Sequence, residues 1–188
     1  MRRLTAAVLG MTATACLLAG CGGSNPDGFN DADAAYATGL VSHHAQTLQL
    51  LDLTLGRDNL DPQIGTLADQ SRQSRFDEAA TAQKWLKTWG KRVPKTVLEH
   101  NHDQDGVTYD TSIPGVLNSH QLHTLEETKG AAFAHAWLRK LIAHEQGAVK
   151  LAADAIEDGQ NAKVVAFAKK DEKTHQQTVA QLERLQAS

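Results

Sequence analysis

Residues 36–47 read YATGLVSHHAQT, and residues 137–148 read WLRKLIAHEQGA. Subtracting 101 from the second stretch aligns its apolar positions with those of the first, and His144 then corresponds to His43. In both stretches the apolar residues recur every three or four positions, which is typical of an amphipathic α-helix. The chain therefore carries one helical element twice. Such a duplication places equivalent side chains near a common pseudo-symmetry axis.

The helical periodicity extends outward from each copy and predicts a hairpin in each half of the chain. The first half is expected to form helices over 30–56 and 61–90, the second of which opens on an Asp-Pro pair. The second half is expected to form helices over 131–157 and 162–188, preceded by a short helix over 118–129. In the helix predicted over 30–56, the inward apolar stripe ends at Leu55.

Past the first turn the offset between the two halves becomes 100, which pairs Ile64 with Val164 and Glu78 with Thr178. Two hairpins with apolar stripes cannot each bury those stripes alone. The sequence therefore predicts an all-α fold, an antiparallel four-helix bundle built from two repeated hairpins with a short extra helix in the connection. The bundle would cover 30–188, with repeat one at 30–90, a linker at 91–117 and repeat two at 118–188.

The N-terminus has the features of a targeting segment. Arg2 and Arg3 precede an apolar run that ends in Leu18-Ala-Gly-Cys21, and this order is typical of a bacterial lipoprotein signal. We expect residues 1–20 to be a signal peptide, Cys21 to be the site of lipid attachment, and 21–29 to be a flexible tether. An ordinary signal peptide, cleaved at a small residue, is the alternative.

Cleavage before Cys21 would leave 168 residues with 17 basic and 22 acidic side chains. This mild acidity, without any basic run, argues against nucleic acid as a partner and against an electrostatic membrane patch. The membrane contact would then be the N-terminal lipid, at the outer face of the bacterial cytoplasmic membrane or in the periplasm. Cys and Met occur only within the first 21 residues, so the mature protein would offer a metal no sulfur ligand apart from the lipidated Cys21.

Turn arithmetic places several polar residues at one level of the predicted bundle. His43 lies about fifteen residues before the first turn and faces a level near residue 74, which Arg75 and Glu78 flank. The same count from His144 arrives at His175. The residues that can cluster in the middle of the bundle are His43, His44, Glu78, His144, Glu145 and His175.

Two interpretations of this cluster remain open at the level of sequence. Imidazole and carboxylate groups suit zinc, copper(II), nickel or iron, so the cluster can be a metal site with His43, His44, His144 and His175 as ligands. Glu78 and Glu145 would be further ligands or their hydrogen-bonding partners. Alternatively, the same groups form a buried hydrogen-bonded layer without a metal, in which Arg75 neutralises a carboxylate. Adjacent residues on a helix point about 100° apart, so at most one of His43 and His44 can face the bundle axis squarely.

Other candidate sites are weaker. His120 and His123 are three residues apart on the short helix, a spacing that can chelate an ion but that more often lies in solvent. Residues 101–106 imitate the start of a calcium loop, but the twelfth position is Ser112, not glutamate. A di-iron bundle needs two Glu-x-x-His motifs, and only Glu172 to His175 fits. We therefore expect no enzymatic activity.

The chain resembles the ferritin-like family 305 of the domains of unknown function. The resemblance rests on the His-His pair, on Asp61-Pro62, on WLKTWG at 85–90, and on GAAF at 130–133 with HEQGAV at 144–149. It extends from about Phe29 to Leu185. It implies a ferritin-like bundle in a secreted or lipid-anchored bacterial protein. Because several members are associated with copper binding or tolerance, it also implies a copper-related role.

The chain departs from the family pattern at the expected methionines and at the second His-His pair, which is His144-Glu145 here. The methionine positions hold Leu40, Leu50, Ala82, Leu141, Leu151 and Leu182. Thioether sulfur favours copper(I), so its absence shifts the expected metal toward copper(II) or zinc. The predicted function is metal buffering or tolerance in the cell envelope. The alternative is a structural or interaction lipoprotein that binds no metal.

Overall fold

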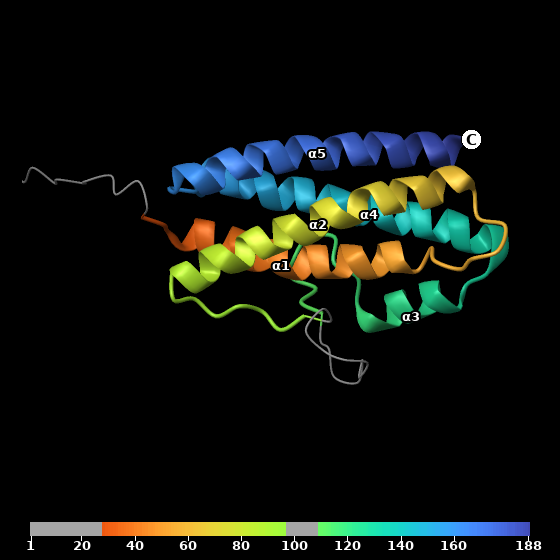
Figure 1. Cartoon of the computed structure of the whole chain (residues 1–188), viewed down its shortest axis with the longest axis horizontal. Coiled ribbons are helices and arrows are strands. Elements are labelled where there is room, and N and C mark those ends of the chain that lie inside the picture. Colours follow the sequence, from red (N-terminus) through yellow and green to blue (C-terminus); the bar gives the residue numbers. More distant parts are fainter. Residues whose placement is uncertain (1–27, 97–108) are drawn as a thin grey trace, which may run out of the picture.

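The computed structural model describes residues 28–96 and 109–188, and within these ranges it contains five helices and no strand. The four long helices lie side by side and the short one, α3, lies beside the bundle (Figure 1). The helices are α1 (Asp31–Asp52), α2 (Pro62–Thr88), α3 (Ser119–Glu127), α4 (Gly130–Asp158) and α5 (Ala162–Ala187). None of the described helices is both long and apolar enough to span a bilayer. The predicted signal peptide, Cys21 and the loop 101–106 lie outside the described residues.

Four of the five described helices begin at a side-chain cap, and α4 begins after Lys129 without one. Asn30 and Asn118 each form a capping box, while Asp61 and Asn161 cap α2 and α5. The first residues of α2 and α5 differ by 100 in number, which is the offset expected from the repeat. These starts confirm the two predicted hairpins.

The predicted end of the first helix is wrong by four residues. α1 ends at Asp52, and the following turn is closed by bonds from Thr54 N–H to the Leu51 carbonyl and from Leu55 N–H to the Asp52 carbonyl. These tighter bonds rotate the chain away from α-helical geometry. Leu55 therefore leaves the inward stripe and is 61% exposed.

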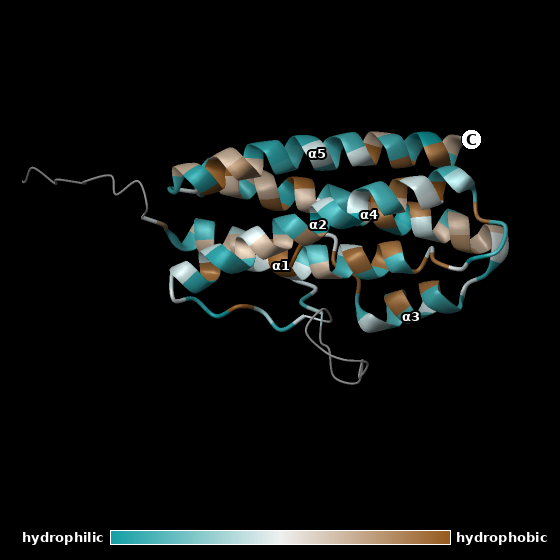
Figure 2. Cartoon of the chain, viewed as in Figure 1, coloured by the Kyte–Doolittle hydropathy of each residue, from teal (hydrophilic) through white to brown (hydrophobic). Residues whose placement is uncertain are grey.

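Two apolar clusters fill the bundle, and polar side chains separate them. One cluster includes Leu50, Trp137 and Leu182, and the other includes Tyr36 and Leu40. The hydrophobic and hydrophilic bands that alternate along each long helix are visible in Figure 2. This pattern is that of amphipathic helices that turn one face toward a shared core.

The connection between the repeats returns to the middle of the bundle. The Gln46 side chain bonds both the N–H and the carbonyl of Leu117, at 2.7 and 2.8 Å. Pro114 and Gly115 lie against Gly147 of α4, where even a Cβ atom would overlap with their backbone. The described end of the linker, residues 109–117, thus packs against α1 and α4 at the level of the histidines.

Candidate metal centre

A buried polar layer crosses the bundle between the two apolar clusters. It contains all six residues predicted to cluster, together with Arg75 and Asp171. The side chain of Glu78 is 16% exposed, and the other members are at most 2% exposed. The polar layer consists of His43, His44, Arg75, Glu78, His144, Glu145, Asp171 and His175.

His43 and His144, the duplicated pair, stack across the α1–α4 interface with ring centroids 3.7 Å apart. His43 Nε2 donates to the His144 carbonyl at 2.9 Å, and His144 Nδ1 donates to the Gly115 carbonyl at 3.0 Å. The Thr47 hydroxyl lies 2.9 Å from His144 Nε2 and 3.5 Å from His43 Nδ1. Every ring nitrogen of this pair therefore has a polar protein atom within 3.5 Å, although the single Thr47 proton serves one acceptor at a time.

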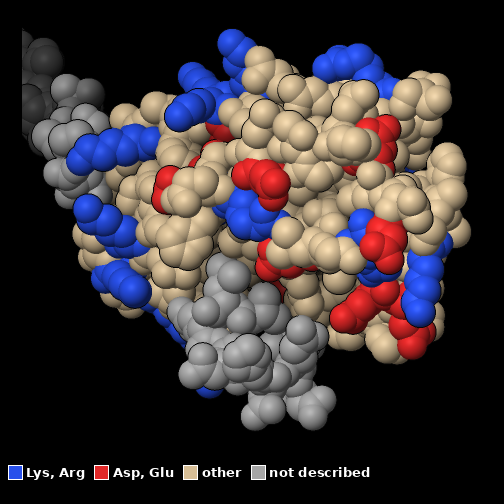
Figure 3. Space-filling model, turned by 45° about the vertical axis from the view of Figure 1, so that its right-hand side comes forward, with Lys and Arg blue, Asp and Glu red and all other residues tan. Residues whose placement is uncertain are grey.

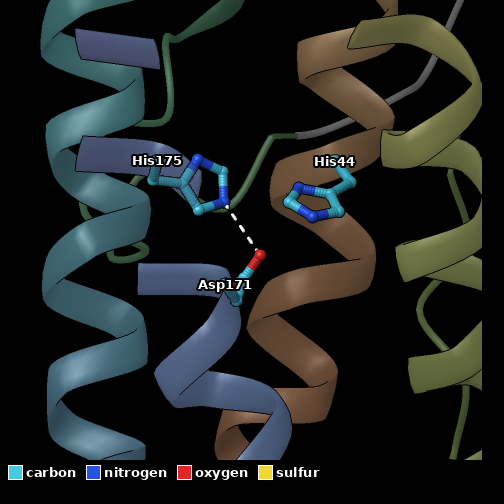
Figure 4. A group of neighbouring side chains, drawn as sticks. All are labelled: His44, Asp171 and His175. Carbon is cyan, nitrogen blue, oxygen red and sulfur yellow. Dashed lines mark ion pairs between the residues drawn. The ribbon is translucent and has the colours of Figure 1, made fainter. Parts of the chain in front are cut away.

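His44, Asp171 and His175 form a second group, which we call the His–Asp group. One ligand atom from each residue lies within 4.8 Å of the other two. Figure 4 shows the imidazole of His44 on α1 facing the carboxylate and imidazole that α5 supplies. Asp171 and His175 are four residues apart, so they project from the same face of α5. His175 Nε2 lies 3.2 Å from Asp171 Oδ1.

Unlike the stacked pair, the His–Asp group has polar atoms without hydrogen bonds. Both ring nitrogens of His44, Asp171 Oδ1 and His175 Nε2 are buried and outside hydrogen-bond geometry with any partner, although the last two face each other as an ion pair at 3.2 Å. His44 Nε2 lies 3.0 Å from Glu78 Oε2, close enough for an ion pair but without hydrogen-bond geometry. Since buried polar atoms are nearly always satisfied in proteins, this convergence needs an explanation.

The remaining atoms of the group are held by neighbours. Tyr36 donates to Asp171 Oδ2 at 2.8 Å, and His175 Nδ1 donates to Glu145 Oε2 at 2.5 Å. A carboxylate on the far nitrogen of an imidazole orients the ring and makes its other nitrogen a better ligand. The neighbours therefore direct Asp171 Oδ1 and His175 Nε2 toward His44.

The four histidines have different charge states. Burial lowers the pKa of His43 well below its usual value, lowers that of His44, and lowers that of His144 to about 4. The pKa of His175 rises to about 9, because the Glu145 and Asp171 carboxylates outweigh its desolvation. At neutral pH three of the histidines are neutral and His175 is an imidazolium.

The acidic groups of the polar layer remain ionised. The neighbouring cations and imidazoles hold the pKa of Glu78 and of Glu145 at about 2, and they lower that of Asp171. Nearby carboxylates raise the pKa of Arg75, so it stays a cation. Three carboxylates thus face two cations, Arg75 and His175, which leaves one negative charge uncompensated in the interior.

The donor set fits a divalent metal ion. Ligands about 2.0–2.2 Å from a common ion lie roughly 3–4 Å apart, so small side-chain rotations would bring the His–Asp group to bonding distance. Glu78 is near enough to His44 to complete a set of four. Two imidazoles and carboxylate oxygens are ligands that suit zinc and copper(II).

The structure separates the predicted ligands into two sets. His44 and His175 belong to the His–Asp group, and Glu78 and Glu145 lie beside it. His43 and His144 make hydrogen bonds elsewhere, and their role as ligands stays a prediction. Asp171 was not among the predicted ligands, although its inward position four residues before His175 was a usable signal.

Three other histidine and glutamate positions point away from the core. The half-buried Glu172 side chain accepts from Gln176, so the Glu-x-x-His spacing does not bring it to the His–Asp group. His120 and His123 are exposed on α3, and His123 lies 3.3 Å from Glu127. Within 28–96 and 109–188, His44, Asp171 and His175 make up the one group of three close ligand residues.

A scan of protein families matches residues 33–186 to the model of DUF305, a domain of unknown function. This chain belongs to the DUF305 family. The match confirms the resemblance stated from the sequence and covers both hairpins. The search of curated proteins found no match.

Solved structures show the same fold as this DUF305 chain. A predicted secreted DUF305 protein from Streptomyces coelicolor is 20% identical, with a TM-score of 0.68 over 83% of this chain and 91% of the other. A DUF305 fragment from Deinococcus radiodurans is 18% identical, with a TM-score of 0.70 over 84% and 97%. CopM in its Cu(II)-bound form is 17% identical, with a TM-score of 0.63 over 82% and 95%. At these identities the likeness establishes the bundle alone.

Proposed function

We propose that this chain binds one divalent transition-metal ion, copper(II) or zinc, through His44, Asp171 and His175. Its role would be to buffer or sequester that metal in the bacterial cell envelope. The observation that carries the proposal is the convergence of buried nitrogen and oxygen atoms that make ion-pair contacts but no hydrogen bonds of good geometry. A metal ion would satisfy all three residues at once.

Charge balance supports a divalent ion. Binding at His175 Nε2 would displace one proton, because the other nitrogen still donates to Glu145. Adding two positive charges and releasing one proton raises the net charge of the polar layer by one. That gain cancels the uncompensated negative charge, which is costly in a buried site.

The ligand chemistry favours copper(II) or zinc over copper(I). CopM, which shares the fold, has been solved with Cu(II) and with Cu(I). In this chain the positions expected to carry methionine hold leucine or alanine, most of them buried in the apolar clusters. The polar layer offers nitrogen and oxygen but no sulfur, the ligand that copper(I) prefers.

Burial supports a binding role and not a catalytic one. His44, Asp171 and His175 are at most 2% exposed, and the apolar clusters close the bundle on both sides of the polar layer. A metal ion can enter through side-chain motion, but an organic substrate would need a cavity beside the ligands. We propose that the protein holds its metal without turning over a substrate.

The proposal is tested by titrating tag-free, chelator-treated protein with Zn²⁺ and Cu²⁺ by calorimetry. We expect one equivalent to bind, and His44→Gln to lower the affinity at least a hundredfold. His144→Gln, an equally buried change outside the His–Asp group, should keep most of the affinity. His120→Gln is the exposed control. Uptake that depends on His144 and not on His44 would place the ion at the stacked pair instead.

A metal-free layer is the second candidate. A proton on His44 would cancel the same negative charge, since Glu78 Oε2 lies 3.0 Å from its Nε2. The protein would then be a structural or interaction lipoprotein stabilised by a buried ionic network. In that case neither metal would bind at micromolar concentration, and the titration would show no heat beyond dilution.

We further propose that the protein is attached to the membrane through a lipid on Cys21. The lipoprotein-like Leu-Ala-Gly-Cys motif supports this attachment. Although the sequence without a basic run predicts no electrostatic membrane patch, Lys and Arg side chains on the face drawn in Figure 3 are densest at the end where α1 begins, which suits a nearby anionic bilayer. Exposed Lys87, Lys91, Arg92 and Lys95 lie on or just after the last turn of α2. Cys21→Ser should move the protein from the membrane fraction to the soluble fraction of cells. Retention of the variant in the membrane fraction would contradict the attachment.

A further inference from the structure

The internal repeat relates the His–Asp group to a second set of residues. The offset of 101 between α1 and α4 pairs His44 with Glu145. The offset of 100 between α2 and α5 pairs Asp171 with Ser71 and His175 with Arg75. We call Glu145, Ser71 and Arg75 the counterpart group.

One contact across the bundle is also equivalent in the two groups. In the His–Asp group, α1 meets α5 through His44 and His175, whose ring centroids are 5.5 Å apart. In the counterpart group, α4 meets α2 through Glu145 and Arg75, with Arg75 Nη2 3.4 Å from Glu145 Oε2. The polar layer therefore contains two related diagonal contacts, and one of them is an ion pair.

The guanidinium of Arg75 is enclosed like a bound cation. Its side chain is 2% exposed, and Nη1 donates to Glu78 Oε2 at 2.7 Å while Nη2 reaches Glu145. Nη2 also lies 3.5 Å from the Thr178 hydroxyl, and Nε has no hydrogen-bond partner. Two carboxylates and a hydroxyl thus surround a positive charge that belongs to the chain itself.

We propose that Arg75 is an internal cation that fills the counterpart of the metal site and limits this chain to one metal ion. The inference rests on the proposed function of the His–Asp group. A histidine can exchange its proton for a metal, but a guanidinium keeps its charge and has no free lone pair. Arg75 therefore occupies the counterpart group permanently. Removing it should open a second site of the same ligand class.

The test is the metal stoichiometry of the full chain in which Ser71→Asp and Arg75→His are combined, measured with Zn²⁺ after chelator treatment. These changes give the counterpart group the same residue types at positions 71 and 75 as its equivalents in α5. We expect the variant to bind one more equivalent than the wild type. Arg75→Lys, which keeps the positive charge, is the matched control and should bind the wild-type number.

A folded double variant that binds the same number of ions as the wild type would overturn the inference. A wild type that binds no zinc would instead overturn the proposed function. The number of zinc ions that the double variant binds beyond the wild type would still test the role of Arg75. Folding is followed by circular dichroism with and without Zn²⁺, also for Arg75→His alone. Folding that requires zinc supports the inference, because the ion then replaces the guanidinium. Failure of both variants to fold even with zinc would contradict it.

Discussion

Two adjacent histidines of α1 have different environments because successive residues on a helix point about 100° apart. His43 turns toward α4 and stacks on His144, while His44 turns toward α5 and Glu78. Both are completely buried. The sequence predicts that only one of the two histidines can face the bundle axis squarely. The packing of α5 decides that His44 is the one that meets Asp171 and His175.

The residue that the sequence did not predict as a ligand is Asp171. Turn arithmetic estimates the level of a residue along the bundle, and His175 was found this way. The helical period also places Asp171, and not Glu172, on the inward stripe with His175, but it does not show that its carboxylate converges on His44. Only the former is buried, at 2% exposure.

Tyr36 should tune the metal affinity without touching the ion. Its hydroxyl donates to Asp171 Oδ2 and thereby orients the opposite oxygen. We expect Tyr36→Phe to weaken Zn²⁺ binding about tenfold, as is usual for groups that orient a ligand. Calorimetric titration of the wild type and the variant checks this, with circular dichroism to establish equal helicity. An unchanged affinity would mean that Asp171 needs no such support.

Metal binding should release about one proton per ion at pH 7–8, because only His175 among the ligands is protonated there. The affinity should rise about tenfold per pH unit up to the His175 pKa of about 9 and then level off. Titrations in buffers of different ionisation enthalpy measure the proton count. Release of no proton would indicate ligands that are already neutral, such as His43 and His144.

Among the helices, the starts of α1, α2, α3 and α5 could be predicted because their caps are local residues such as Asn30 and Asp61, while α4 begins one residue before the predicted position and has no side-chain cap. The docking of the linker could not be predicted. The part that packs on the bundle, at 109–117, has no periodicity, and its contacts with α1 and α4 are between residues distant in sequence. Nothing in the sequence around Gln46 or Gly147 indicates that these residues contact the linker.

Gly147 is the position on which linker packing should depend most. A Cβ there would overlap with the Pro114 carbonyl and the Gly115 nitrogen, which are backbone atoms and cannot rotate away. We expect Gly147→Ala to lower the free energy of unfolding by about 1–3 kcal/mol. Chemical denaturation measures the loss. Gly65→Ala in α2, where nothing lies within 4 Å, is the control and should not destabilise the protein.

At the scale of the whole molecule, the polar layer should make the metal-free protein most stable near pH 6.5. The folded pKa of His144 is depressed to about 4, so its stabilising contribution is complete above 6.5 and is lost as pH falls through 4. The loss is about 3 kcal/mol. The folded pKa of His175 is raised to about 9, so its contribution is complete below 6.5 and is lost as pH rises through 9. The melting temperature measured between pH 4.5 and 9 should therefore have a maximum near pH 6.5. A melting temperature that rises steadily as the pH is lowered would contradict these two contributions.

In the proposed metal-bound protein, His44, Asp171 and His175 hold one divalent ion. The most direct measurement is a Zn²⁺ titration of Asp171→Asn beside the wild type, because this substitution keeps the shape of the side chain and removes its charge. We predict one equivalent in the wild type and an affinity at least a hundredfold lower in the variant, with both proteins folded. Equal binding by the two proteins, or no binding by the wild type, would contradict the claim.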